Sequence, residues 1–198
     1  MTQKIVSNED CFIQAVNISD HLDLIYSYEK ESYPEDEAAT YEKLKYRLLH
    51  ANDVFRGYFR MDTLDRPHVG SQDTTQQTTN MTDLNPSKPV QLIGFVCGTK
   101  TSHSTLTHDS MSVNDPNGRT LCIHSVVIKK EFRNCGLGLH MLQLYLNYLR
   151  ENHICDQVLL ITKKHLIHFY EKAGFKLNGE SNVVHGQEKW YECELLLI

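Results

Sequence analysis

Apolar residues recur along the chain with two different spacings. Short stretches alternate or run continuously apolar, as strands do, and longer stretches repeat every three to four residues, as amphipathic helices do. Strands are predicted at residues 11–16, 54–60, 90–99, 121–128, 158–162, 175–177 and 190–197. Helices are predicted at residues 20–31, 35–50, 136–152 and 165–172, with Gly174 as the C-terminal cap of the last one. This order predicts a mixed α/β fold.

Two polar stretches interrupt the pattern. Residues 62–88 are rich in Thr, Gln, Asp and Asn, and residues 100–119 in Ser, Thr, His and Asp. Both contain too few apolar side chains to build a core of their own. A chain of 198 residues is of a size that forms one domain around one core. We therefore predict a single domain over residues 1–198 that carries two polar loop insertions.

Composition excludes several classes of protein. The formal net charge of −5 lacks the basic excess that contacts with a nucleic-acid backbone need. No run of about 18 apolar residues is present, so no membrane span is expected. The six cysteines form no Cys-x-x-Cys pair and no apolar signal segment opens the chain, which favours reduced thiols in the cytoplasm. His165 and His168 lack further ligands at usual spacing, so we expect no metal, and we expect a monomer.

A glycine-bearing turn precedes the third predicted helix. Residues 133–138 read Arg-Asn-Cys-Gly-Leu-Gly and follow the most strand-like stretch of the chain. The start of a helix exposes unpaired backbone N–H groups and a partial positive charge, so such a turn can hold a pyrophosphate. Gly136 and Gly138 alone are equally compatible with an ordinary loop and helix start.

Three sequence motifs follow one another along the chain. They are Ile123-His124-Ser125-Val126-Val127-Ile128, then Arg133-x-x-Gly136-x-Gly138, then His168-Phe169-Tyr170-Glu171-Lys172-Ala173-Gly174-Phe175. Together they resemble the conserved core of the GNAT superfamily of N-acetyltransferases. With Tyr33-Pro34-Glu35-Asp36-Glu37-Ala38-Ala39, the chain resembles more closely the arylalkylamine N-acetyltransferases, including fungal polyamine-acetylating members. The resemblance implies a splayed, mostly antiparallel mixed sheet of about seven strands and about four helices. It also implies direct acetyl transfer from acetyl-CoA to a primary amine.

The resemblance also assigns roles to residues. It assigns the thioester arm of acetyl-CoA to the backbone of Val126, Val127 and Ile128. It assigns the pyrophosphate to Asn134, Cys135, Gly136, Leu137, Gly138 and Leu139, and the same loop adds Arg133 as a cofactor-binding residue. Tyr170 takes the place of the tyrosine that protonates the departing thiolate, although a tyrosine simply packed in a helix is the alternative.

The proton acceptor is less well defined. A primary amine with a pKa near about 10 arrives protonated and must lose a proton before it attacks a carbonyl. The family places two histidines two residues apart on one strand face, whereas this chain has Cys122 and His124. His124 can act alone through water or can be a buried histidine bonded in the core. Cys122 is read as a small core residue, and a covalent thiol mechanism is not favoured.

The acceptor substrate stays open between polyamines and arylalkylamines. An acidic cluster favours a cationic polyamine slightly, although a solvated acidic face is the simpler interpretation. The cluster consists of Glu29, Glu31, Glu35, Asp36 and Glu37. Two alternatives remain: an acetyl-CoA-binding interaction module, suggested by Cys122, and a protein lysine or N-terminal acetyltransferase.

Overall fold

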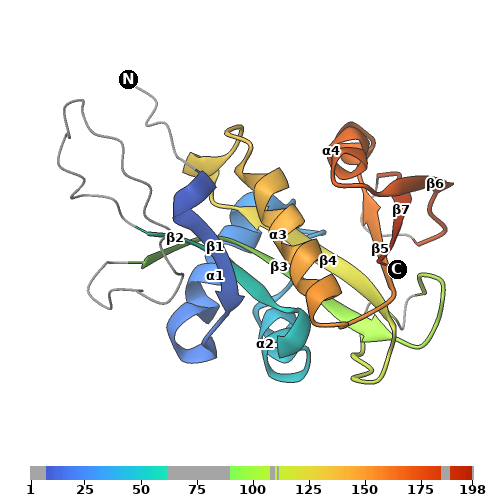
Figure 1. The fold of residues 1–198 in the computed structure, drawn as a ribbon, viewed down its shortest axis with the longest axis horizontal. Coiled ribbons are helices and arrows are strands. Elements are labelled where there is room, and N and C mark those ends of the chain that lie inside the picture. The colour runs from blue at the N-terminus through green and yellow to red at the C-terminus, as the bar shows by residue number, and fades with distance from the viewer. Residues whose placement is uncertain (1–7, 62–89, 108–109, 111, 184–187, 198) are drawn as a thin grey trace, which may run out of the picture.

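The computed structural model describes residues 8–61, 90–107, 110, 112–183 and 188–197. Within these residues the chain forms seven strands and four α-helices (Figure 1). In chain order they are β1 (Cys11–Ala15), α1 (Ile18–Ser32), α2 (Tyr41–His50), β2 (Arg56–Met61), β3 (Val90–Thr101), β4 (Thr120–Ile128), α3 (Leu137–Glu151), β5 (Gln157–Thr162), α4 (Ile167–Lys172), β6 (Lys176–Glu180) and β7 (Tyr191–Leu196). Short 3₁₀ turns lie at Asn8–Asp10, Asn52–Val54, Lys130–Phe132 and Lys164–Leu166.

The seven strands form one sheet in the order β1-β2-β3-β4-β5-β7-β6. Neighbouring strands are antiparallel except β4 and β5, which are parallel. The β4–β5 pairing runs only from Thr120↔Gln157 to Ile123↔Leu160, although β4 continues to Ile128. The two strands therefore diverge in the middle of the sheet. The splayed mixed sheet of about seven strands and four helices is confirmed.

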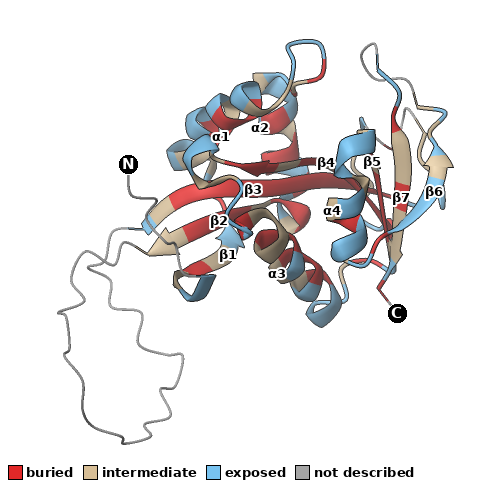
Figure 2. Cartoon of the chain, turned by 90° about the horizontal axis from the view of Figure 1, so that it is seen from above, coloured by how far each residue is buried: buried red, intermediate tan, exposed pale blue. Residues whose placement is uncertain are grey.

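Helices cover both faces of the central strands. Figure 2 shows α1 and α2 on one face of the sheet and α3 on the other. On the α3 side, Met141, Leu142 and Tyr145 belong to one buried cluster, and on the α1/α2 side Leu44 and Phe95 belong to another. A strand that is covered on both faces needs apolar side chains on both, which explains the continuous apolar run of β3.

The predicted start of α2 and the predicted end of β3 were wrong. α2 begins at Tyr41 rather than at residue 35, because the Thr40 side chain accepts a hydrogen bond from the Lys43 N–H at 3.3 Å and caps the helix there. β3 extends to Thr101, so the second polar loop starts at Ser102. Lys100, predicted to lie in that loop, is buried and pairs with Asp53 at 2.6 Å. The predicted loop at 62–88 lies outside the described residues.

Cysteine side chains are spread over the fold. All six are free thiols, of which Cys135 is exposed and the other five are buried. Among the described residues, no three His, Cys, Asp or Glu side chains come together to hold a metal ion. No helix in this part of the chain is long and apolar enough to cross a membrane.

Candidate active site

A β-bulge in β4 is the central feature of the site. Across the β3–β4 pair, Cys97 lies opposite Ser125, whereas the next residue, Gly98, lies opposite Ile123. His124 is therefore the extra residue of the bulge. Glycine is needed on the facing strand, since a Cβ atom at Gly98 would lie 2.4 Å from the carbonyl oxygen of Cys122. Bulges redirect side chains, and this one occurs at the residue where β4 leaves β5.

The bulge changes which face the β4 side chains occupy. Before it, Leu121 and Ile123 belong to the core on the α3 side. After it, Val127 belongs to the core under α1 and α2, and the Ser125 hydroxyl reaches Glu29 of α1 at 3.1 Å. The acidic and polar groups next to the bulge therefore collect on the α1/α2 face.

His124 is held by a short chain of hydrogen bonds. The Thr99 hydroxyl donates to the Ser110 carbonyl at 2.8 Å and lies 2.7 Å from His124 Nε2. A hydroxyl has one hydrogen, which is committed to the carbonyl, so His124 Nε2–H must donate to Thr99. A neutral imidazole in this tautomer carries its basic lone pair on Nδ1. The hydrogen bond thus orients the ring and sets which nitrogen can accept a proton.

Cys122 is poorly suited to be a base. Its side chain is fully buried, and burial raises the pKa of its thiol to about 11, against the opposing effect of a hydrogen bond with Ser110. The thiol therefore stays protonated at neutral pH. Cys122 and His124 both interact with groups near Ser110, but the Cys122 thiol has no basic lone pair comparable to that of an imidazole.

A buried carboxyl group lies below the bulge. Glu29 is 1% exposed, and its Oε1 accepts hydrogen bonds from the Ala39 N–H at 2.9 Å and from the Ser125 hydroxyl. Burial raises the pKa of Glu29, and among the described residues its Oε2 has no hydrogen-bond partner. The expectation that Glu29 belongs to a solvated acidic face was wrong, because the helical period turns it into the sheet.

One donor of β4 is engaged by a tyrosine from the Tyr-Pro-Glu-Asp-Glu segment. The Val126 N–H donates to the Tyr33 hydroxyl at 3.3 Å. Burial raises the pKa of Tyr33 well above its usual value, and Glu29 and Tyr170 raise it further. In the sequence, Tyr33 stood out only as part of the motif that resembles the family. No sequence signal predicted its position beside β4.

The glycine turn leads into an uncapped helix. Gly136 is the N-cap of α3 with φ 80°, and no side chain caps it. The first hydrogen bond of the helix is His140 N–H to the Gly136 carbonyl at 3.2 Å, so the N–H groups of Leu137, Gly138 and Leu139 have no acceptor within the helix. A Cβ atom at Gly138 would lie 3.5 Å from the Phe169 ring. The N-terminus of α3 therefore faces α4, the helix that follows β5.

Other predicted pyrophosphate residues have structural contacts. The Arg133 guanidinium donates to the Ile128 carbonyl at 2.8 Å and to the Ser32 hydroxyl at 2.8 Å, which ties the end of β4 to α1. Asn134 is left-handed, with φ 61°, and Cys135 Sγ donates to the Arg133 carbonyl at 3.3 Å. Contacts of this loop with a cofactor stay a prediction.

Tyr170 lies on α4, across the divergence of the strands. It is 8% exposed, and its ring contacts Phe169 and Phe175 with centroid distances of 5.0 and 5.8 Å. Burial raises its pKa well above the usual range, and Cys193 adds to this effect. The phenol therefore keeps its proton at neutral pH and can only donate it. At the end of β5, the buried Thr162 Oγ1 has no hydrogen-bond partner among the described residues.

A buried ion pair joins the segment after α1 to the segment after β5. Lys163 Nζ lies 2.5 Å from Glu37 Oε1 and 3.0 Å from Glu188 Oε2. The same ammonium lies 4.1 Å from the centroid of the Trp190 ring. This network holds the two segments together, and sequence spacing gave no indication of it.

Comparisons with known proteins agree with this geometry. A model of the acetyltransferase (GNAT) family matches residues 22–175. The serotonin N-acetyltransferase of Mesocricetus auratus is 30% identical over 107 residues, which are 54% of this chain and 52% of that protein, so the match spans about half the length of this curated relative. The loading GNATL domain of CurA from Lyngbya majuscula has a TM-score of 0.68 at 12% identity, over 94% of this chain and 98% of that one. AAC(6')-Ib in complex with paromomycin and acetyl-CoA has a TM-score of 0.57 at 14% identity, over 94% and 93%.

Proposed function

The chain belongs to the acetyltransferase (GNAT) family, and from this membership we propose that it transfers the acetyl group of acetyl-CoA to a primary amine. The resemblance to a serotonin N-acetyltransferase supports an amine as the acceptor. Polyamines and arylalkylamines are the two candidate classes. The observation that carries the proposal is that an uncapped α3 N-terminus and the helix carrying a buried tyrosine lie next to each other, beside the diverging β4–β5 pair.

The residues at the start of α3 suit acetyl-CoA. The N–H groups of Leu137, Gly138 and Leu139, which have no acceptor within the helix, suit its pyrophosphate, because a helix N-terminus attracts an anion. A side chain at Gly136 would meet nothing within 4 Å, so the turn is open to a ligand.

Acetyl-CoA, when bound, supplies an acetyl group activated as a thioester. We assign the Val126 N–H to the thioester carbonyl oxygen, because a positioned backbone donor stabilises the charge that develops there. The hydrogen bond from the Val126 N–H to the Tyr33 hydroxyl is long, at 3.3 Å, so replacing the hydroxyl by the thioester oxygen costs little stabilisation. Transfer forms the bond from nitrogen to the carbonyl carbon and breaks the bond to sulfur.

Two proton transfers complete the reaction. The acceptor ammonium loses a proton, for which His124 is the candidate acceptor, because its hydrogen bond with Thr99 orients the imidazole beside the bulge. The departing thiolate gains a proton, which we assign to the Tyr170 hydroxyl because Tyr170 takes the place of the thiolate-protonating tyrosine in the family motif. These assignments need no covalent intermediate on Cys122.

Features of the site bear on the substrate class. Glu29 is buried and Glu37 is paired with Lys163, so two of the five acidic side chains do not offer free charge to a polycation. Glu31, Glu35 and Asp36 are exposed. The electrostatic support for a polyamine is therefore weaker than the sequence indicated.

The proposal is tested by measuring thiol release from acetyl-CoA with a panel of acceptors. The panel contains spermidine, putrescine, tyramine, serotonin and a histone-tail peptide. Turnover with at least one small amine is expected. Turnover with the peptide alone would contradict a small-molecule acceptor, and binding of acetyl-CoA without any turnover would favour an interaction module.

A further inference from the structure

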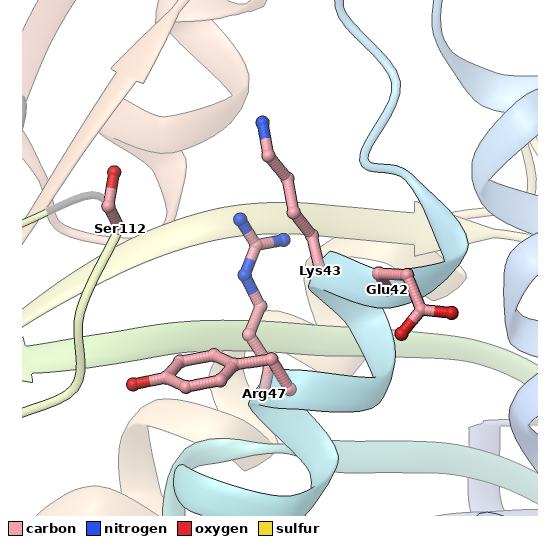
Figure 3. A pocket seen from close by; sticks show the side chains of 5 residues that line it. Glu42, Lys43, Arg47 and Ser112 are labelled. Carbon is pink, nitrogen blue, oxygen red and sulfur yellow. The ribbon is translucent and has the colours of Figure 1, made fainter.

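A cavity of about 160 Å³ lies beside α2, and no step described above uses it. Its lining consists of Glu42, Lys43, Tyr46, Arg47 and Ser112. Figure 3 shows Arg47 and Lys43 extending from α2 into the same space, with Ser112 across from them. The Glu42 carboxylate turns away from the Arg47 guanidinium in this view. The charged groups of the lining are therefore two cations, Lys43 and Arg47, and one carboxylate that points away from Arg47.

Arg47 has donors to spare. Arg47 is buried, with 8% exposed, and among the described residues its guanidinium makes a single hydrogen bond, from Nη1 to Cys97 Sγ at 3.9 Å. A guanidinium carries five N–H donors, and sulfur is a weak acceptor. Among the described residues, the only fully enclosed polar side-chain atoms without a partner are Glu29 Oε2 and Thr162 Oγ1. The remaining Arg47 donors are therefore not sealed in the core but border the cavity.

The walls of the cavity are fixed before any ligand binds. The Asn114 N–H donates to the Tyr46 hydroxyl at 3.2 Å, and Asn114 Nδ2 donates to the His50 carbonyl at 2.6 Å. Asn114 Oδ1 in turn accepts from the Lys100 N–H at 2.8 Å. These bonds hold the loop that carries Ser112 against α2, so the donors of Arg47 are preorganised.

The cavity adjoins the proposed reaction centre. Cys97, which Arg47 contacts, lies opposite Ser125 in the β3–β4 register, and Ser125 follows the bulge residue His124. On the other wall, Ser112 lies two residues from Ser110, whose carbonyl accepts from Thr99 in the hydrogen-bond chain to His124. A ligand group held by Arg47 would thus belong to the acceptor substrate.

We propose that this cavity binds a carboxylate of the acceptor, so that the substrate is a primary amine that also carries a carboxylate group. This inference rests on the proposed function. A guanidinium matches a carboxylate through two parallel hydrogen bonds, and Lys43 adds a second positive charge at the rim. The second ammonium of a polyamine would meet two like charges there instead. Arg47 is thereby a specificity-determining residue.

A purely structural role of Arg47 predicts something different. Arg47 lowers the pKa of Glu29, so it could serve only to balance that buried charge. However, the two side chains form no direct hydrogen bond or ion pair in the described part of the chain. A balancing role would affect all acceptors alike, whereas a carboxylate site affects only those that carry a carboxylate.

The test compares acceptors that differ by one carboxylate. Thiol release is measured with the full chain and acetyl-CoA for tyrosine and tyramine, ornithine and putrescine, and 5-aminopentanoate and pentylamine. We expect the carboxylate member of at least one pair to have the higher kcat/KM by about tenfold or more, the range of a hydrogen bond to a charged group. Arg47→Met should remove that advantage and change the partner amine by less than about threefold.

Control variants keep the outcome clear. Lys45→Met removes a charge from an exposed position of α2 that does not line the cavity. It should leave the ratio of kcat/KM within each acceptor pair unchanged. If Arg47→Met does not fold, Lys43→Glu at the exposed rim should lower the carboxylate preference instead. Binding of glutarate by calorimetry, lost in either cavity variant, gives a readout that is independent of turnover.

The outcomes separate this inference from the proposed function. No turnover with any amine would overturn the proposed function. Turnover without a carboxylate preference, or an equal loss in both members of each pair on Arg47→Met, would overturn the carboxylate site and leave the acetyltransferase activity standing.

Discussion

Lys163→Met should be the most destabilising single change at the ion-pair network, because it leaves a buried carboxylate without its cation. The Glu37 side chain is 5% exposed and that of Lys163 is 12% exposed. Breaking a buried pair by removing one partner costs about 3–5 kcal/mol, and we expect about 3 kcal/mol here. In a chain of this size about 1 kcal/mol shifts Tm by about 2–4 °C, so Tm should fall by about 6–12 °C.

The measurement is urea unfolding at pH 7.5, with Cm and m fitted separately. Burial lowers the pKa of Lys163, but its bonds to Glu37 and Glu188 outweigh burial and the net pKa is raised. A lysine with a raised pKa keeps its stabilising charge until the pH exceeds that pKa, so pH 7.5 is well inside the stable window.

Two controls accompany this measurement. Lys189→Met makes the same substitution at a lysine whose pair with Glu180 is exposed, and it should leave Cm nearly unchanged. Glu188→Gln removes the exposed partner of Lys163 and should cost less than about 1 kcal/mol. Equally small decreases of Cm in Lys163→Met and Lys189→Met would show that Glu37 is solvated in solution and would refute the reasoning.

Three further predictions concern the reaction centre. Tyr170→Phe should lower kcat by about 100-fold with little change in the KM of the amine, because a general acid acts only as the thiolate leaves; full activity would remove Tyr170 from the mechanism. His124→Gln should lower activity and flatten the acidic limb of the pH–rate profile, whereas Cys122→Ala should change kcat by less than about threefold; the reverse ranking would make the thiol part of the proton path. Glu29→Gln keeps an acceptor for Ala39 and removes a carboxyl whose pKa burial raises, so the wild type should lose stability relative to the variant as pH rises from about 4.3 through the raised pKa. Urea unfolding of both proteins between pH 4.5 and 8 checks this, and a pH-independent difference would contradict it.

The sequence by itself determined the order and type of the elements. Apolar spacing located all seven strands and four helices, since the buried face of each element leaves its own period in the chain. Local chemistry also set some ends: Gly174 follows α4 with φ 98°, which few residues other than glycine adopt. The start of α2 was missed because the cap at Thr40 competes with a pattern that looks helical from residue 35.

The tertiary structure alone decided how chemical groups meet. The sequence suggested His124 and Tyr170 by motif, but the bond from His124 to Thr99 and the burial of Tyr170 depend on strand register and on α4 packing. Cys122 was correctly interpreted as a small core residue, since its side chain is fully buried. Its degree of burial follows from the packing of the sheet, which the sequence alone does not give.

The acidic cluster shows the same division. In the sequence, Glu29 and Glu37 stand among neighbours of like charge and look equivalent to them. In the fold, Glu29 lies under β4 against Ser125, and Glu37 lies against Lys163, which is 126 residues away along the chain. The partner of a charged side chain is set by contacts between distant segments, and these leave no period in the sequence. For this reason the fold and the family could be predicted from the sequence, while the charge and partners of each candidate site residue emerge only when the sheet and helices pack.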